Sequence, residues 1–256
     1  MYVDNLILSE GSSLHLGGVN LHCNTFTNHG GSYEGGRIVL PNYAPVAFCQ
    51  GAVVAVGEVP NIDGGSFDPD GDDVILYFAQ DPPGPFAEAG IYDVTLTVTD
   101  PSSGATDSCT ATVVVYDPSA GFVTGGGWID SPQGAYAPDV SLAGKANFGF
   151  VSKYKKGATV PTGQTEFVFQ AGNLNFHSSS YEWLVVTGSN YARFKGTGTI
   201  NGYGPYKFRL WAGDSAADTF HIKIWEENES TGEETDVYDN GFDQEIGGGS
   251  IVIHTK

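Results

Sequence analysis

Basic residues are scarce in this sequence. Its 256 residues include 11 Lys and Arg against 30 Asp and Glu, which gives a formal net charge of -19. Phosphate recognition needs a basic surface, so the composition argues against nucleic acid as a partner. The deficit is greatest before Lys145, where Arg37 stands alone against seventeen acidic residues, whereas the rest of the chain has ten basic and thirteen acidic residues. Two surfaces of different character are joined here; the acidic excess aids solubility and attracts divalent cations.

Long apolar runs are also missing. No stretch approaches the length of about 20 residues that a membrane-spanning helix requires, so we expect no membrane insertion. Residues 1–5 lack the basic start and the apolar stretch of a signal peptide, so a secreted protein with this sequence would be a mature form or a fragment. The 36 Gly and 13 Pro leave little room for a substantial helix. The sequence therefore predicts an all-β protein of two or three small domains.

Catalytic signals are weak, and cysteine is rare. The six His residues are scattered, and no Ser lies in a Gly-x-Ser-x-Gly context. A carboxylate pair for glycoside hydrolysis cannot be assigned from spacing alone. We therefore expect no enzyme. Three Cys and one Met fit an oxidising compartment in which one disulfide forms and one thiol remains.

An acidic turn and a clear strand lie in the middle of the chain. The turn holds four carboxylates within six residues around a Pro and a Gly: Asp68, Asp70, Asp72 and Asp73. It is not an EF-hand, because position twelve is Ala79. A calcium site that uses two or three of these carboxylates is one interpretation; an exposed turn whose Asp side chains cap backbone amides is the other. Residues 94–99 alternate apolar residues with Thr, which predicts a strand with one buried face.

Residues 44–117 resemble the polycystic-kidney-disease (PKD) and hyalin-repeat modules of secreted bacterial surface proteins. The resemblance rests on the sequence Ala-Pro-Val-Ala at 44–47, the acidic turn, the Gly-x-Tyr-x-Val-x-Leu-x-Val strand from Gly90, and residues 110–115. It implies an immunoglobulin-like sandwich with a disulfide between Cys49 and Cys109. The Trp-x-Phe-Gly-Asp strand of the PKD type is absent, which places the module nearer the hyalin repeats. Cys23 is then left over, as either a buried strand residue or an intermolecular link.

The regions on either side predict two further parts. Residues 1–43 contain short strands broken by Asn and Gly, with too little apolar mass for an independent core; they suit the rungs of a β-solenoid or a cap on the next domain. Residues 122–256 contain longer, aromatic-rich strands, which predict a jelly-roll-like β-sandwich. This part resembles the post-COAP type domain of bacterial and archaeal surface proteins through motifs such as Gly-Gly-Gly-Trp-Ile at 125–129 and the strand 218–225.

Aromatic side chains of the C-terminal part are candidates for ligand binding. Strand parity places Trp211 and Trp225 on the outer face, and Tyr203 lies in the loop of the preceding hairpin. These rings could stack on a sugar, since a pyranose face presents C–H groups to an indole or phenol ring. Alternatively, the outward Trp side chains cover the edge of an adjacent loop.

These features predict a secreted, non-catalytic protein with an adhesive or structural role at a cell surface. The expected partners are surface glycans, surface proteins or other copies of the chain. One alternative is a self-assembling fibre subunit, in which residues 1–40 and the terminal strand 250–254 contact or complete a neighbouring copy. The other alternative is a carbohydrate-binding module.

Overall fold

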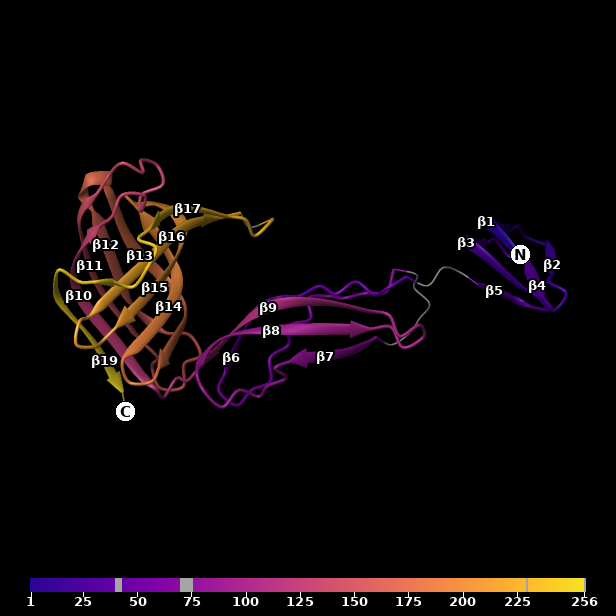
Figure 1. The fold of residues 1–256 in the computed structure, drawn as a ribbon, viewed down its shortest axis with the longest axis horizontal. Helices are drawn as coiled ribbons and strands as arrows, with labels where there is room; N and C mark the ends of the chain where they lie inside the picture. The colour runs from indigo at the N-terminus through magenta and orange to yellow at the C-terminus, as the bar shows by residue number, and fades with distance from the viewer. Residues whose placement is uncertain (40–42, 70–75, 229, 256) are drawn as a thin grey trace. The chain divides into compact units, whose positions relative to one another are not determined.

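A computed structural model describes residues 1–39, 43–69, 76–228 and 230–255 (Figure 1). The all-β prediction is confirmed: strands account for the regular structure of the described residues apart from one 3₁₀ turn, Gln170–Gly172. Packing divides the chain into two compact units, one made of residues 1–50, 62–83 and 94–111 and the other of residues 51–61, 84–93 and 112–256. The bounds 1–43, 44–117 and 122–256 follow the strand pattern and stay predictions.

The N-terminal segment consists of short parallel strands in two stacks. The strands are β1 (Tyr2–Leu8), β2 (Ser13–His15), β3 (Asn20–Asn28), β4 (Ser32–Glu34) and β5 (Arg37–Val39). β1, β3 and β5 form one sheet and β2 and β4 the other. Each strand pairs with one that follows it by nearly a constant interval, as Tyr2 does with His22 and Ser13 with Ser32. Parallel pairing at such a repeat is the arrangement of coils in a β-solenoid.

The interior of this segment is small and contains the free cysteine. Leu8, Leu16 and Leu21 are buried, and Cys23 beside them is 1% exposed. Burial raises the pKa of the Cys23 thiol, because a buried thiolate lacks solvation. Of the two interpretations of Cys23, the structure agrees with the buried strand residue, and the intermolecular link stays a prediction.

The module in the middle of the chain has four strands in one sheet. They are β6 (Ala52–Ala55), β7 (Tyr77–Asp81), β8 (Gly90–Thr99) and β9 (Thr106–Tyr116), in the order β6-β9-β8-β7. The predicted alternation in β8 is present: Val94, Leu96 and Val98 are buried, and the Thr residues between them lie on the opposite face. Two isolated antiparallel bridges, Val46 with Phe67 and Cys49 with Asp63, join the segments outside this sheet.

The C-terminal part is a ten-stranded sheet. Its strands are β10 (Gly121–Ser131), β11 (Gly144–Lys153), β12 (Thr162–Phe169), β13 (Leu174–Thr187), β14 (Tyr191–Ile200), β15 (Tyr203–Gly213), β16 (Thr219–Glu227), β17 (Glu234–Asp239), β18 (Gln244–Glu245) and β19 (Gly248–Thr255). From β10 to β17 each strand pairs with the next one along the chain, and β19 pairs with β10. This meander differs from the predicted jelly-roll-like connectivity, because successive strands are joined as neighbours instead of crossing between two sheets.

Figure 1 shows the sheet curled on itself, and buried aromatic rings make up much of its core. The fully buried residues include Phe167, Phe194, Phe208, Phe220 and Tyr238, which come from five different strands. Phe220 stacks on Phe148 with ring centroids 3.9 Å apart. Burial of rings of this size is the main source of stability in such a core.

The terminal strand β19 has both edges occupied. One edge pairs with β10. On the other, the backbone N–H of Ile251 donates to Asp218 Oδ2 at 2.8 Å, and that of Ile253 donates to Asp214 Oδ2 at 2.7 Å. In this structure the strand 250–254 completes its own domain, and the expectation that it contacts a neighbouring copy stays a prediction.

Candidate functional site

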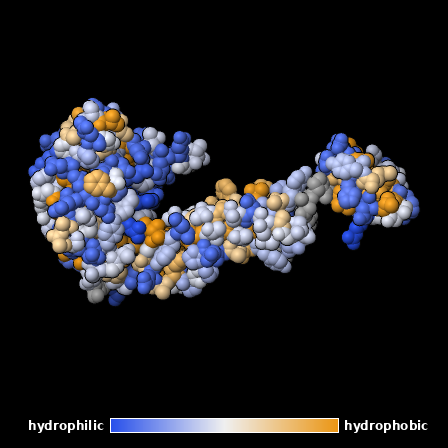
Figure 2. Space-filling model, viewed as in Figure 1, coloured by the Kyte–Doolittle hydropathy of each residue, from blue (hydrophilic) through white to orange (hydrophobic). Residues whose placement is uncertain are grey.

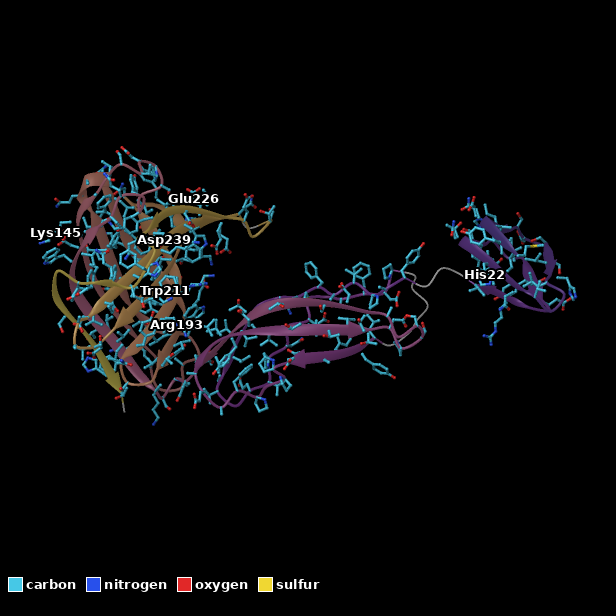
Figure 3. All side chains as sticks on the ribbon, in the orientation of Figure 1. His22, Lys145, Arg193, Trp211, Glu226 and Asp239 are labelled. Atoms are coloured by element: carbon cyan, nitrogen blue, oxygen red, sulfur yellow. A yellow bond between two sulfur atoms is a disulfide. The ribbon has the colours of Figure 1, made fainter. Side chains whose placement is uncertain are left out.

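Basic and aromatic side chains gather on the outer surface of strands β13 to β16. We call this surface the basic face and define it by nine residues: Trp183, Arg193, Lys195, Lys207, Arg209, Trp211, His221, Lys223 and Trp225. It carries five of the eleven Lys and Arg residues and three of the four Trp residues of the chain. Figure 3 shows Arg193 and Trp211 on the same side of the domain and Lys145 on the other. A protein with a net charge of -19 therefore places nearly half of its Lys and Arg residues on one surface.

Strand alternation and register assemble the basic face. Arg193 and Lys195 alternate along β14 with the buried Ala192 and Phe194. Because neighbouring strands are in antiparallel register, outward residues line up in rows across the sheet. One row runs through Arg193, Trp211 and His221, and the next runs through Lys195, Arg209, Lys223 and Asp239. The first row combines a cation with two rings, and the second holds three cations and a carboxylate.

Carboxylates pair with the lysines of this face. Glu182 lies 2.6 Å from Lys207 Nζ and 3.5 Å from Lys195 Nζ. Lys223 Nζ lies 2.9 Å from Glu234 and 3.0 Å from Asp236. These half-buried ion pairs hold the long side chains over the sheet, where their alkyl stems cover the rings beneath.

His221 links the face to the end of β17. Its Nε2 lies 2.8 Å from Asp239 Oδ1, and its ring stacks on Trp211 with centroids 4.1 Å apart. Burial raises the pKa of the Asp239 carboxyl, but hydrogen bonds from His221 and from the backbone N–H of Gly241 outweigh it, so that the net shift is downward. Asp239 is therefore held in its charged form.

The Trp rings support cations and do not form an open stacking surface. Trp225 is on the outer face, as strand parity predicts, but it is 1% exposed and has the ammonium groups of Lys195 and Lys223 over its ring, 5.5 and 5.3 Å from the centroid. Trp211 contacts His221 and, at 5.7 Å, the guanidinium of Arg209. Trp225 is therefore not available to stack on a sugar.

Tyr203 lies apart from these rings. It is 77% exposed at the start of β15, whereas Trp211 lies near the end of the same strand. Eight residues of extended chain separate them by roughly 26 Å at about 3.3 Å per residue. The structure therefore does not bring Tyr203 and Trp211 together in one site.

A shallow hollow lies elsewhere on the same sheet. Its volume is about 370 Å³, and it is lined by polar residues of β12 and β13 such as Glu166, His177 and Ser178. The His177 ring lies 3.7 Å from Glu166. The Ser178 hydroxyl accepts a hydrogen bond from the backbone N–H of Thr165 at 2.8 Å, which holds neighbouring strands together. This hollow is polar and open.

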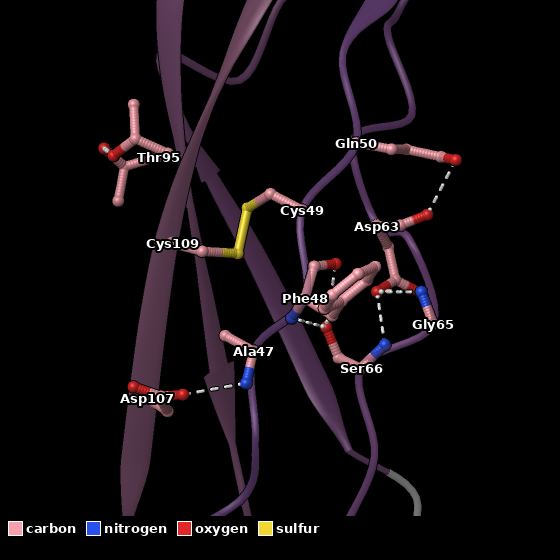
Figure 4. Close-up of a disulfide and its surroundings, with 11 residues drawn as sticks. Ala47, Phe48, Cys49, Gln50, Asp63, Gly65, Ser66, Thr95, Asp107 and Cys109 are labelled. Atoms are coloured by element: carbon pink, nitrogen blue, oxygen red, sulfur yellow. Dashed lines mark hydrogen bonds between the residues drawn. A yellow bond between two sulfur atoms is a disulfide. The ribbon is translucent and has the colours of Figure 1, made fainter. Parts of the chain in front are cut away.

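The expected disulfide between Cys49 and Cys109 is present, with the two Cα atoms 5.8 Å apart (Figure 4). The Asp107 carboxylate accepts a hydrogen bond from the backbone N–H of Ala47 at 2.8 Å. Hydrogen bonds from Ala47 and Ser108 lower the pKa of the Asp107 carboxyl. The disulfide and this hydrogen bond tie residues 47–49 to β9.

The acidic turn lies mostly outside the described residues. Asp68 is described and half-buried, whereas Asp70, Asp72 and Asp73 are not described. In the described part of the chain, no three His, Cys, Asp or Glu side chains are grouped so that they could hold a metal ion. Calcium at this turn stays a prediction.

Comparisons with known proteins identify no family for this chain. No family model matches this chain, and no curated protein matches it. A solved structure, the lipoprotein BT2262 from Bacteroides thetaiotaomicron, is 13% identical; the match covers 66% of this chain and 98% of that one, with a TM-score of 0.19. A TM-score this low shows neither a shared fold nor a shared function. Among the described residues, no helix has the length and apolar character needed to cross a membrane.

Proposed function

We propose that this chain is a secreted, non-catalytic surface protein with an adhesive role, and that its C-terminal sheet binds surface polysaccharide through the basic face. The observation that carries the proposal is the gathering of five of the eleven Lys and Arg residues on one surface of a strongly acidic protein. Carboxylates offset the charge of the three lysines in part, and the two arginines add to the attraction for acidic partners, whereas the acidic remainder of the molecule repels them. The disulfide supports an oxidising, extracellular location.

A matched pair of residues on the other side of the domain provides the control. Lys145 Nζ lies 4.3 Å from the centroid of Trp128, so the same kind of contact occurs there in isolation. In Figure 3 Lys145 lies on the side opposite Arg193 and Trp211. In Figure 2 the visible surface of this domain is mainly hydrophilic, with apolar atoms scattered over it. Charge is therefore the property that distinguishes the basic face.

The experiment measures adhesion of the purified full chain to immobilised bacterial and host-cell polysaccharides by biolayer interferometry. We expect binding that weakens as salt rises, because exposed charge interactions are screened. The variant Lys195→Gln with Lys223→Gln should bind several-fold more weakly, and Lys145→Gln should bind as the unmodified chain does. Equal binding by all three proteins would contradict the proposal.

The N-terminal segment favours self-association as a second role. β1 pairs on one side with β3, and Tyr2 and Ile7 on this strand are exposed. An edge strand with exposed apolar residues can pair with another chain. Light scattering of the full chain beside a variant that lacks residues 1–40 tests this role: it predicts that assemblies disappear on deletion, and a monomeric full chain at high concentration would contradict it.

A further inference from the structure

Two arginines of the basic face lack the ionic partners that its lysines have. Lys195 and Lys207 share Glu182, and Lys223 contacts Glu234 and Asp236. Arg193 and Arg209 form no ion pair with any carboxylate among the described residues, and the Nε atom of each is buried without a hydrogen-bond partner there. Arginine at such a position is usually paired, because an unpaired buried charge is costly.

Arg209 is held between two rings. Its guanidinium carbon lies 5.8 Å from the centroid of Trp183 and 5.7 Å from that of Trp211. Burial lowers the pKa of this guanidinium, and the charge of Arg193 acts in the same direction, while Glu234 and Glu182 oppose it. The rings fix the orientation of the group, so that little conformational entropy would be lost when it binds an anion.

The register places the two arginines close enough to share one ligand group. Arg193 pairs with Trp211 on the adjacent strand, and Arg209 is two residues from Trp211 on the same face. Diagonal neighbours of this kind have Cα atoms about 7–8 Å apart. Two guanidinium groups at that separation can converge on one carboxylate or sulfate, each donating N–H groups in its planar fork.

We propose that Arg193 and Arg209 form a binding site for a single carboxylate or sulfate group on a sugar residue of an acidic polysaccharide. The proposal rests on the proposed adhesive function and names the chemical group that the basic face recognises. Around the arginines, Glu182, Glu234 and Asp239 provide acceptors for hydroxyl groups, which sugars offer in number. The same carboxylates disfavour nucleic acid, whose closely spaced phosphates would meet them.

The test compares the full chain with two double variants and a control. Arg193→Gln with Arg209→Gln removes both charges, Arg193→Lys with Arg209→Lys keeps them without the planar fork, and Lys145→Gln changes the opposite side of the domain. The probes are alginate, which carries carboxylates, dextran sulfate, which carries sulfates, and neutral dextran, each measured by isothermal titration calorimetry at fixed salt. Binding of alginate identifies the anionic group as a carboxylate, and binding of dextran sulfate identifies it as a sulfate.

We expect the full chain to bind alginate or dextran sulfate and not dextran. The Gln variant should bind at least about tenfold more weakly, the Lys variant should lie between, and Lys145→Gln should be unchanged. Binding of the acidic polymers at unaltered affinity by the Gln variant would overturn the proposal, as would equal binding of neutral dextran. Binding of other surface polysaccharides without either acidic polymer would overturn this inference and leave the adhesive function standing, whereas binding of no polysaccharide at all would remove both.

A stability measurement separates a binding role from a structural one. If the arginines serve to bind, removing two unpaired charges should leave the melting temperature of the Gln variant unchanged or raise it. Sodium sulfate should raise the melting temperature of the unmodified chain more than sodium chloride of equal ionic strength, and this difference should be smaller in the Gln variant, which keeps only the general stabilising effect of sulfate. A lower melting temperature in the variant with the same sulfate response would assign the arginines to structure alone.

Discussion

At the scale of single residues, a buried carboxylate organises the turn between β8 and β9. Asp100 is fully buried. It accepts hydrogen bonds from the backbone N–H of Ser102 at 2.7 Å and from the hydroxyl groups of Ser102 and Ser103 at 3.0 and 2.5 Å. One acidic side chain therefore satisfies several donors, which brings the chain back into β9.

Replacing Asp100 with Ala should lower the free energy of unfolding by about 1–3 kcal/mol, because it removes a fully buried carboxylate that accepts several hydrogen bonds. Urea unfolding measures the change. Asp139 is the matched control: it accepts the same pattern of bonds from the backbone and hydroxyl of Ser141 but is exposed. Asp139→Ala should lower the free energy of unfolding less than Asp100→Ala does. An equal or larger loss in Asp139→Ala would contradict the role given to burial.

The carboxyl of Asp239 should make stability depend on pH. Its pKa in the folded chain is lower than the ordinary value of 3.8, so its contribution is fully present above that value and is lost as pH falls through the folded pKa. The contribution is no more than about 1 kcal/mol, because the side chain is partly exposed to solvent. The free energy of unfolding, measured from pH 6 to pH 2, should fall less steeply with pH in Asp239→Asn than in the unmodified chain. Parallel curves would show that the carboxyl contributes nothing to the pH dependence.

At the scale of elements, the alternation of residues along a strand predicted which face each side chain occupies. It did not predict which residues of other strands cover that side chain. Val94, Leu96 and Val98 were readable as the buried face of one strand, because alternation is local. Trp225 was placed on the correct face, but its burial depends on Lys195 from another strand, which only the register brings over the ring. The alternation of Arg193 and Lys195 with apolar residues was the signal for the basic face, and it was missed.

The alternation of residues also did not predict how the strands are connected and paired. Strand lengths in the C-terminal part were consistent with a jelly roll or a meander, and the choice depends on which strands pair. In the N-terminal segment, Asn and Gly at short intervals indicated brief strands, and the pairing of Tyr2 with His22 supplies the parallel repeat that makes them solenoid-like. The two unpaired arginines could not be found without the positions of every nearby carboxylate.

The carboxylates of Asp214 and Asp218 should protect the edge of β19. Replacing both with Ala leaves the N–H groups of Ile251 and Ile253 without acceptors, which should cost about 1–3 kcal/mol for each group that stays buried. It should also expose a strand edge that pairs with other copies, seen as mass that rises with concentration in light scattering. Asp130→Ala, on an exposed position of β10, is the control. A stable, monomeric double variant would contradict this role.

At the scale of the whole molecule, part of the middle module belongs to the same compact unit as the C-terminal sheet. Val114 and Tyr116 at the end of β9 form a buried cluster with Trp183 and Val185 on the outer surface of β13. Tyr116 stacks on Tyr154 with ring centroids 5.2 Å apart, and the Tyr154 hydroxyl donates to the carbonyl of Leu184 at 3.1 Å. This packing buries Trp183 and thereby supports the ring that holds Arg209.

Tyr116→Ala should therefore destabilise the C-terminal sheet, although the residue precedes that sheet in the chain. Loss of a large buried ring costs about 3–5 kcal/mol. All four Trp residues lie in the C-terminal part, so an unfolding curve followed by Trp fluorescence reports on this sheet and should shift to lower denaturant concentration. Tyr92→Ala is the matched control, because that ring stacks on Phe86 with centroids 4.3 Å apart and is not part of the cluster around Trp183. If the Trp-detected denaturant midpoint moves no further with Tyr116→Ala than with Tyr92→Ala, the cluster does not couple the end of β9 to the stability of the C-terminal sheet. A larger shift together with weaker binding of acidic polysaccharide would show that the packing under Trp183 also maintains the basic face.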